Sequence, residues 1–346
     1  MAYFKNATFT NKAAQRFEFD IENLDIAIVN GIRRVILSDI PVYGFQGEAE
    51  GSIVIHKNNG PLHNEFMSHR IGLLPIHIPE DNTDTYIFTC DVKNESADSI
   101  NVTTKNLTGT RNDQPLTEKE LSTLFPANPI TKQNVLITRL RRGEELAFTA
   151  TAVKKTAKDH ASFSPVSLCS FYYVQDPAKA NETTNILDKE RAYFKNEYGE
   201  ASLIRFMIEP ELALSPSYLV TKAIQILIDK LTSLNYTTTL NTSMPNTIDM
   251  HISNQTDTIG NLLQSLLFNE FVRKKNKLAG LYDVTFVGYF APHPLEENIV
   301  LRMSLGEDKT LTLEEFQQYL LDAIQVHVTN QVKQVLDAWM RFDVRI

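Results

Sequence analysis

IENLDIAIVNGIRRVIL, residues 21–37, and ISNQTDTIGNLLQSLL, residues 252–267, are two versions of one pattern. Each predicts a strand that turns into an amphipathic helix. In both, an aspartate (Asp25 or Asp257) is expected just before the helix, where its carboxylate can cap free N–H groups. The aspartates align after a slip of one residue, whereas four other pairs align without one: Ile21 and Ile252, Asn23 and Asn254, Ile28 and Ile259, and Asn30 and Asn261.

The repeated pattern allows two interpretations. Strand-to-helix corners converge on Asp and Asn, so a few matches can arise without a common design. The interpretation that we favour is a pseudo-dimer, in which two α+β units of one chain pack against each other through their helices. The expected fold class is therefore α+β, with two dimerisation units that form an intramolecular pair.

Composition limits the classes of function. The chain has 346 residues, of which 42% are hydrophobic, and this is enough for two or three packed domains. The net charge of -8 argues against binding of nucleic acid through bulk electrostatics, because neutralising phosphates takes clustered Lys and Arg. We therefore expect protein partners, and no sequence-specific binding of nucleic acid. The sequence has no signal-like apolar core and no run of about twenty apolar residues, which predicts an intracellular protein without membrane contact.

Periodicity and composition divide the chain into three parts. Residues 1–78 and 200–234 make up the first α+β unit, in which residues 73–78 are expected to form a buried strand and residues 216–231 a helix. Residues 79–199, rich in Asn, Thr, Asp and Ser, form an inserted β-rich domain that includes a strand at 169–174. Residues 235–346 form the second α+β unit, and the polar stretch 232–246 joins the two halves.

The final helix is the best-supported element. Apolar residues recur every three or four positions from Leu313 to Phe342, and Thr312 with Glu315 forms a capping-box pair at its start. About thirty residues make a rod of roughly 45 Å, which is longer than one small sheet can cover. Part of the apolar stripe therefore needs the other half of the chain. The residues expected to pack between the halves are Ile28, Ile32, Leu227, Leu231, Ile259, Leu263, Leu320, Ile324, Val328 and Trp339.

Three motifs of the first half carry a resemblance to a known family. They are NGIRRVILSDIPVYGF from Asn30, NEFMSHRIGLLPI from Asn64 and HASFSPVSLCSFYY from His160. They are similar to the dimerisation domain of the RNA polymerase alpha-like family, which includes the bacterial alpha protein, its archaeal D-type counterpart and the third-largest subunit of polymerase II. Some members carry metal-binding cysteine clusters in the inserted domain, which Cys90 and Cys169 cannot supply.

The second half resembles the partner protein in the same family. QTDTIGNLLQSLL from Gln255 and VTFVGYFAPHPLEENIVLRM from Val284 are similar to the archaeal L-type partner and its small eukaryotic counterpart. The resemblance implies a fused pseudo-heterodimer that serves as a non-catalytic assembly platform of a DNA-directed RNA polymerase. Its partners would be the two largest subunits and the small assembly subunits. Such fusions resemble those of nucleocytoplasmic large DNA viruses, which implies action in the host cytoplasm or nucleus and packaging in the virion.

The resemblance also implies contact residues for other subunits. Arg33 and Arg34 correspond to an arginine pair that lies, in the family, where the platform meets the second-largest subunit. Two guanidinium groups can make bidentate contacts to carboxylates that Lys cannot copy. A solvated helix face is the plain alternative for this pair.

Four more residues are candidate subunit contacts. His69 and Arg70 lie beside the apolar run 73–78, and a hydrogen-bonded structural histidine is the alternative for His69. His293, between two prolines, shapes a loop, and Glu296 follows it at the surface.

No pattern predicts a catalytic, metal or cofactor site. The cysteines Cys90 and Cys169 are too few for a structural zinc site of thiolates. A hydrolase site around His160 and Ser164 lacks an oxyanion loop. The basic stretch RKKNKLAG from Arg273 is either a solvated loop or a contact to nucleic acid. The rival to the assembly platform is a scaffold protein that forms homo-oligomers through its long final helix.

Overall fold

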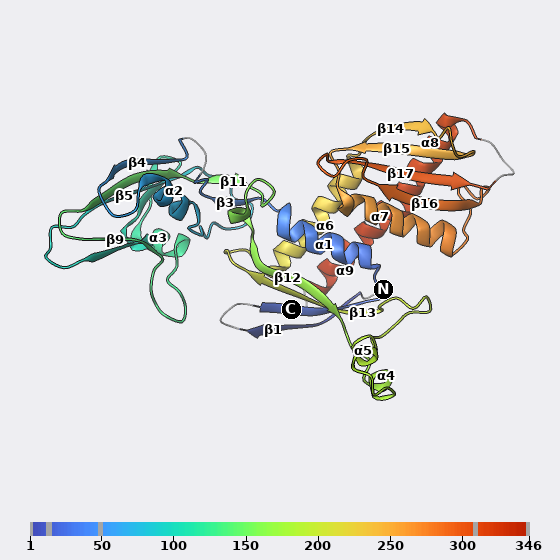
Figure 1. Ribbon diagram of the computed structural model, residues 1–346, viewed down its shortest axis with the longest axis horizontal. Coiled ribbons are helices and arrows are strands. Elements are labelled where there is room, and N and C mark those ends of the chain that lie inside the picture. Colours follow the sequence, from blue (N-terminus) through green and yellow to red (C-terminus); the bar gives the residue numbers. More distant parts are fainter. Residues whose placement is uncertain (1–2, 12–15, 48–50, 307–310, 344–346) are drawn as a thin grey trace.

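Two four-stranded antiparallel sheets of the same design organise the chain, as the computed structural model shows (Figure 1). The structure describes residues 3–11, 16–47, 51–306 and 311–343. The first sheet consists, in spatial order, of β1 (Phe4–Asn11), β2 (Arg16–Glu22), β13 (Leu203–Pro210) and β12 (Val166–Tyr173). The second consists of β14 (Asn235–Leu240), β15 (Thr247–Ser253), β17 (Asn298–Leu305) and β16 (Val284–Phe290). The fold class is α+β, as predicted.

Helices follow the strands at equivalent places in the two halves. In the first half, α1 (Ile26–Ser38) follows β2, and α6 (Pro216–Thr232) follows β13. In the second half, α7 (Asp257–Leu267) follows β15 and continues into the π-helical η3 (Phe268–Arg273). The final helix, after β17, consists of α8 (Leu313–Ala323), the π-helical η4 (Ile324–Thr329) and α9 (Asn330–Asp343). The order strand, strand, helix, strand, strand, helix therefore occurs twice, interrupted in the first half by an insertion.

The strand-to-helix corner explains the repeated sequence pattern. Asn23 (φ 51°) and Asn254 (φ 58°) both take the left-handed conformation, which Asn tolerates better than most residues. Asp25 caps α1 and accepts a hydrogen bond from the Ala27 N–H at 2.8 Å. Asp257 does not precede its helix as predicted, because it is the first residue of α7 and Thr256 holds the cap position. The caps thus lie equally far from the two asparagines, and no slip is needed.

The insertion is a separate lobe with its own sheet and core (Figure 1). Its sheet has the order β4 (Ile53–Asn58), β10 (Glu145–Thr151), β5 (Tyr86–Lys93), β7 (Thr108–Arg111) and β8 (Gln114–Pro115). Two smaller pairings join β6 (Ile100–Thr103) to β9 (Leu136–Leu140), and β3 (Val42–Gly44) to β11 (Val153–Lys155). Helices α2 (Asn64–Gly72) and α3 (Glu118–Leu124) belong to the same lobe, while α4 (Pro177–Asn181) and α5 (Ile186–Glu190) lie between β12 and β13.

Several predicted elements of the first half were wrong. Residues 73–78 form no strand; after the unpredicted helix α2 they bury Leu74, Ile76 and Ile78 in the insertion's core. β4 pairs with β10 in the insertion rather than with the first sheet, and β12, expected in the insertion, pairs with β13. The join between the halves is shorter than expected, because β14 lies within it. The division into domains stays a prediction, but this strand pairing moves the start of the insertion toward Phe45.

Two helical glycines make opposite predictions about stability. A Cβ at Gly31 in α1 would lie 3.5 Å from Leu227 Cδ1, an ordinary contact, so Gly31→Ala should stabilise the chain by about 0.5–1 kcal/mol through helix propensity. A Cβ at Gly260 in α7 would lie 2.4 Å from Cδ2 of Tyr289, so Gly260→Ala should destabilise it by about 1–3 kcal/mol through overpacking. Urea unfolding of the two variants measures both changes, and equal effects would contradict these contacts.

Candidate functional site

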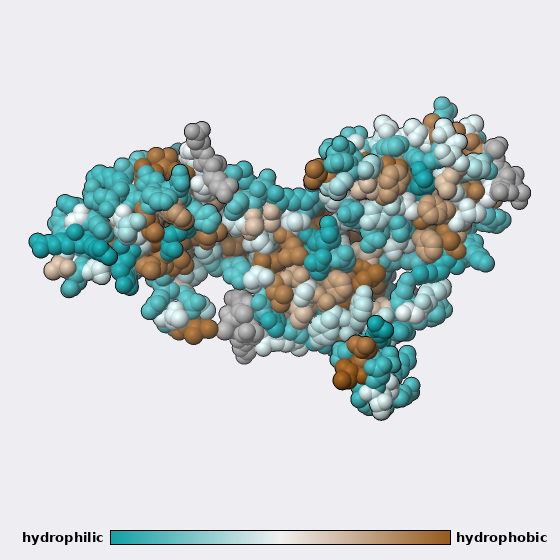
Figure 2. All heavy atoms as spheres, viewed as in Figure 1, coloured by the Kyte–Doolittle hydropathy of each residue, from teal (hydrophilic) through white to brown (hydrophobic). Residues whose placement is uncertain are grey.

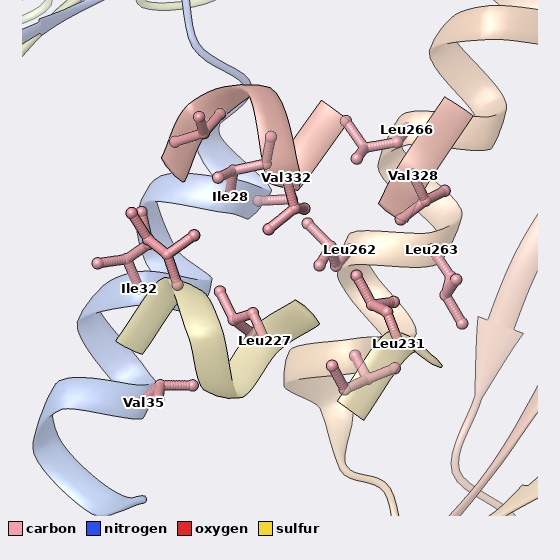
Figure 3. Packing of buried hydrophobic residues seen from close by; sticks show 14 of the residues in the cluster. Ile28, Ile32, Val35, Leu227, Leu231, Leu262, Leu263, Leu266, Val328 and Val332 are labelled. Carbon is pink, nitrogen blue, oxygen red and sulfur yellow. The ribbon is translucent and has the colours of Figure 1, made fainter. Parts of the chain in front are cut away.

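The main candidate site is the junction where helices of the two halves meet. Helix α1 contacts α6 and α7, and α6 contacts α9. Figure 3 shows side chains from these helices pointing toward one another, among them Ile32 of α1, Leu227 of α6 and Leu262 of α7. One continuous hydrophobic core runs through both sheets and the helices between them. The ten residues predicted to pack between the halves are all buried in it: Ile28, Ile32, Leu227, Leu231, Ile259, Leu263, Leu320, Ile324, Val328 and Trp339.

The final helix packs first against its own half and then against the other half. Its first part, α8, packs on β14 and β15 of its own sheet, and carries Leu320. Its last part, α9, contacts α6 and β1 of the first half. The π-helical η4 between them contacts α7 and α6, so the helix changes partner there. Thr312 and Glu315 form the predicted capping box at its start.

Trp339 is the largest side chain of α9 that is fully buried. Its side chain is fully buried, and its ring centroid lies 5.0 Å from those of Phe4 and Phe19. Its indole N–H donates to Thr221 Oγ1 at 3.1 Å, on α6. The residue therefore joins the end of the chain to β1, β2 and α6 of the other half.

Polar contacts set the register of α1 against α7. Ser265 Oγ donates to Asp25 at 3.0 Å, and Asn269 Nδ2 donates to the same carboxylate at 2.6 Å. At the other end of the pair, Arg34 Nε donates to Thr258 Oγ1 at 2.7 Å. The start of each helix thus meets the later part of the other, so the two run antiparallel. Thr258, Ser265 and Asn269 were not predicted, although polar residues at helical spacing on an apolar helix are a usable signal.

Arg33 and Arg34 have different surroundings, although they are neighbours. Arg33 is half-buried, and its Nε donates to Asn30 Oδ1 at 2.9 Å within the same helix. Arg34 is exposed, apart from its bond to Thr258 in the second half. The bond gives Arg34 a role inside the chain, and a contact of the pair with another subunit stays a prediction.

The basic stretch after α7 lies beside a cleft of about 540 Å³ between the halves. Arg273 Nη2 lies 2.8 Å from Glu200 Oε1, and its guanidinium is 4.7 Å from the centre of the Tyr198 ring. The hydrogen bond with Arg273 lowers the pKa of Glu200 and raises that of Arg273. Lys274 pairs with Glu270, and Lys277 pairs with Asp283. Three of the four cations in this stretch are therefore paired with carboxylates, and Arg273 joins the stretch to the segment before β13.

The four remaining contact candidates are all exposed. His69 and Arg70 lie in the last turn of α2, where Arg70 Nε donates to the Ile137 carbonyl at 2.9 Å. His293 and Glu296 lie in the short loop between β16 and β17, and His293 Nδ1 accepts from the Leu295 N–H at 3.2 Å. The structure does not bring these two pairs to the junction between the halves, since α2 belongs to the inserted lobe.

The residues weighed for catalysis and for metal binding do not form such sites in the part of the chain that the structure describes. His160 Nδ1 lies 2.8 Å from Ser162 Oγ, whereas Ser164 Oγ donates to the Val166 carbonyl, so the pair weighed for a hydrolase does not form. Among the residues that the structure describes, no group of three or more His, Cys, Asp or Glu could hold a metal ion. In the same part of the chain, no helix is both long and apolar enough to cross a bilayer.

The two cysteine thiols should be unreactive in the folded chain. Cys90 and Cys169 are 2% and 5% exposed, and burial raises the pKa of each to about 12 from an ordinary 9.0. At pH 8 a thiol-specific chromogenic reagent should therefore react with neither thiol before unfolding, and with both in denaturant. Stability that depends on the neutral thiols is complete below pH 9 and is lost as the pH rises toward 12. Rapid reaction of either thiol in the native state would contradict this packing.

Comparison with known proteins identifies a matching family model and several relatives of the chain. A family model described as the RNA polymerase Rpb3/Rpb11 dimerisation domain matches residues 18–231, from β2 to the end of α6. The chain is 29% identical over 182 residues to the DNA-directed RNA polymerases I and III subunit RPAC1 of Homo sapiens, a match that covers 46% of this chain and 51% of that protein.

Two further relatives come from an amoeba and an archaeon. The chain is 26% identical over 275 residues to the DNA-directed RNA polymerase II subunit rpb3 of Dictyostelium discoideum, covering 62% of this chain and 89% of that one. It is 27% identical over 188 residues to the DNA-directed RNA polymerase subunit Rpo3 of Methanosphaera stadtmanae, covering 53% and 67%. The match to the human and bovine proteins spans about half of their length, 51% in each case.

Proposed function

The chain belongs to the RNA polymerase Rpb3/Rpb11 dimerisation-domain family, and from this premise we propose that it is an assembly-platform subunit of a multisubunit DNA-directed RNA polymerase. The observation that supports the proposal best is the junction itself, where two units of the same strand and helix order share one core. The names of the human, amoebal and archaeal relatives are all those of polymerase subunits.

In this proposal the second half is the partner that another chain would otherwise supply. The family match ends at Leu231, so the assignment of residues 235–346 rests on their equivalent topology and their resemblance to the archaeal L-type partner. Only Ser233 and Leu234 separate α6 from β14. So short a connection suits a fusion of two subunits, because the paired units already bring the two ends together.

Fusion makes the pairing independent of concentration. A short covalent connection gives an effective concentration of about 1 mM. Two separate chains at about 1 μM would pair less favourably by roughly 4 kcal/mol, since each factor of ten is worth about 1.4 kcal/mol. The paired halves would then present one preformed surface, which nucleates association with the two largest, catalytic subunits and the small assembly subunits. The chain itself carries out no chemistry in this proposal and needs no cofactor.

Arginine substitutions test the proposed contact with the large subunits. Arg33→Ala and Arg34→Ala should weaken co-purification of the second-largest polymerase subunit, because each removes a guanidinium that can hold a carboxylate. Loss of the Arg34 bond to Thr258 should cost only about 0.5–1.5 kcal/mol, so both variants should fold. Arg142→Ala, at an exposed arginine of the insertion, is the matched control. Full recovery of the large subunit with both variants would refute the contact.

Light scattering separates the platform from the rival scaffold. If the halves are mutual partners, the purified chain should be a monomer of 39.3 kDa in size-exclusion chromatography with light scattering. A stable dimer over a tenfold dilution would favour a scaffold that forms homo-oligomers through the final helix.

The proposal extends to the origin of the chain. A single-chain fusion of the two subunits resembles those of nucleocytoplasmic large DNA viruses, whose polymerase would act in the host cytoplasm or nucleus and be packaged in the virion. Mass spectrometry of purified virions from the source tests this point, and absence of the chain from them would contradict packaging.

A further inference from the structure

Helix α2 presents an apolar edge to solvent, directly before the residues that were expected to form a buried strand. Its inner face is conventional, since Met67 and Ile71 are buried in the core of the insertion. On the outer face, Phe66 is 59% exposed and Leu73, at the C-cap, is 54% exposed. His69 and Arg70 lie between them and are also exposed. These four residues are called the α2 face below.

The α2 face is held rigidly. Ser68 Oγ donates to the Gly47 carbonyl at 2.9 Å, and a Cβ on Gly47 would lie 2.8 Å from the Ser68 carbonyl oxygen. A Cβ on Gly72 would lie 3.0 Å from the Gly47 N, so two glycines let α2 approach its neighbouring segment closely. Arg70 also fixes α2 to β9 by donating to the carbonyls of Leu136 and Ile137. Exposed side chains on such a fixed element lose little entropy on binding.

Exposed apolar residues and two hollows lie beside the α2 face. Val135 and Leu136, beside the Arg70 contacts, are 41% and 43% exposed. One hollow adjoins the start of α2 at residues 58–65, and a second, lined by His69, Leu73 and His160, adjoins its end. In Figure 2, hydrophobic residues interrupt the hydrophilic surface of the lobe in which Figure 1 places α2. Exposed apolar side chains that gather on one element mark an interaction site more often than ones scattered singly.

We propose that the α2 face docks against an amphipathic, acidic helix of another polymerase subunit. The spacing of Phe66, the pair His69 and Arg70, and Leu73 gives an apolar edge about 10 Å long, at 1.5 Å per residue, which fits the groove of a second helix. Neither His69 nor Arg70 forms an ion pair with any residue in the described ranges, and the only carboxylate on α2 is Glu65. Charge complementarity therefore calls for carboxylates on the partner. This inference rests on the proposed function and names the chemistry of one partner.

Charge-introducing variants of the full chain test the proposal in the assembled enzyme. Phe66→Asp and Leu73→Asp should each reduce recovery of one polymerase subunit at least tenfold, since a carboxylate would be buried against the apolar and acidic partner helix. His69→Glu should reduce recovery of the same subunit. Raising the salt concentration should make the recovery with this variant and the recovery with the parent chain more alike. Leu187→Asp is the matched control, at an apolar residue of α5 that is 64% exposed. This variant should recover all the polymerase subunits that the parent chain recovers. All four variants should keep the parental melting temperature because the changed side chains are exposed.

A photoreactive amino acid at position 69 identifies what covers the face. The cross-linked peptide, sequenced by mass spectrometry, should come from a polymerase subunit and contain carboxylates at helical spacing among apolar residues. Full subunit recovery with Phe66→Asp and Leu73→Asp would overturn the docking proposal and leave the platform function intact. Recovery of no polymerase subunit by the parent chain would overturn both. A cross-linked peptide that is basic, or that comes from a second copy of the chain, would also overturn the assignment.

Discussion

Trp339→Ala is expected to lower the free energy of unfolding by about 3–5 kcal/mol, the range for deleting a large aromatic side chain from a core. The indole is fully buried against Phe4 and Phe19, and its N–H is bonded to Thr221. Its removal leaves a cavity that three separate elements would have to close. Because α9 contributes this side chain to the first half, the loss should weaken the attachment of the halves as well as the local packing.

Two further variants make the Trp339 measurement specific. Trp339→Phe keeps much of the ring packing and removes the bond to Thr221, so it should cost less than the alanine variant, about 1–3 kcal/mol. Met340→Ala, at a neighbouring residue that is 49% exposed, should change stability by about 0.5 kcal/mol or less. Guanidinium unfolding monitored by far-ultraviolet circular dichroism measures all three. A loss below about 1 kcal/mol for Trp339→Ala would show that α9 is not a structural part of the first half.

The elements predicted well from the sequence are those in which apolar residues recur at helical spacing over many turns. The final helix repeats its apolar residues over about eight turns, and Thr312 with Glu315 marks its start, so no competing interpretation fits. Helix α6 has Ser215 as its cap and Pro216 in its first turn, both observed. The apolar pattern of the final helix does not reveal the π-helical η4, at which the helix changes its packing partner from one half to the other.

The apolar run at residues 71–78 shows why short segments mislead. Ile71 belongs to α2, whereas Leu74, Ile76 and Ile78 are alternately buried in an irregular segment that belongs to no strand. A short apolar run does not distinguish a strand from an irregular segment that buries every second side chain. The helix before it carries polar and apolar residues on both sides, so its period was weak. For the same reason Phe66 and Leu73 could not be recognised as exposed.

The boundary of the insertion depended on pairing between distant residues. β4 lies in sequence next to the first unit, yet its partner is β10, which no local pattern reveals. β14 is a run of Asn, Tyr and Thr that reads as a polar linker, but it is an edge strand beside β15 and needs few apolar side chains. β1 likewise pairs with β2 at the edge of the first sheet.

The candidate site was predictable in its apolar part and not in its polar part. Buried positions such as Ile28 and Leu263 follow from helical periodicity, and all ten residues named from it are in the core. The partners of Asp25 and Arg34 lie in the other half of the chain, and single-sequence analysis has no means to pair them. The contact between Arg273 and Glu200 could not be predicted for the same reason, since only folding brings these distant residues together.

Separate expression of the halves is expected to produce the largest effect of all. Residues 1–233 and 234–346 would each expose the apolar helix faces that now form one core, from Ile32 and Leu227 on one side to Leu262 and Val332 on the other. Each fully buried side chain of this kind is worth about 1.5–3 kcal/mol. These four side chains alone amount to about 6–12 kcal/mol of gross burial, which is comparable with the about 5–15 kcal/mol of net stability of a typical domain. Each piece alone should therefore lack a cooperative unfolding transition, or aggregate.

Mixing the two purified pieces is the measurement that tests the pairing of the halves most directly. Refolded together at equal concentration, they should elute as one species near 39.3 kDa and regain the cooperative unfolding of the intact chain. A full chain with a protease site inserted between Ser233 and Leu234 should, after cleavage, keep both pieces together. If either piece alone is folded, soluble and monomeric, and does not bind the other on mixing, the halves are not each other's packing partners.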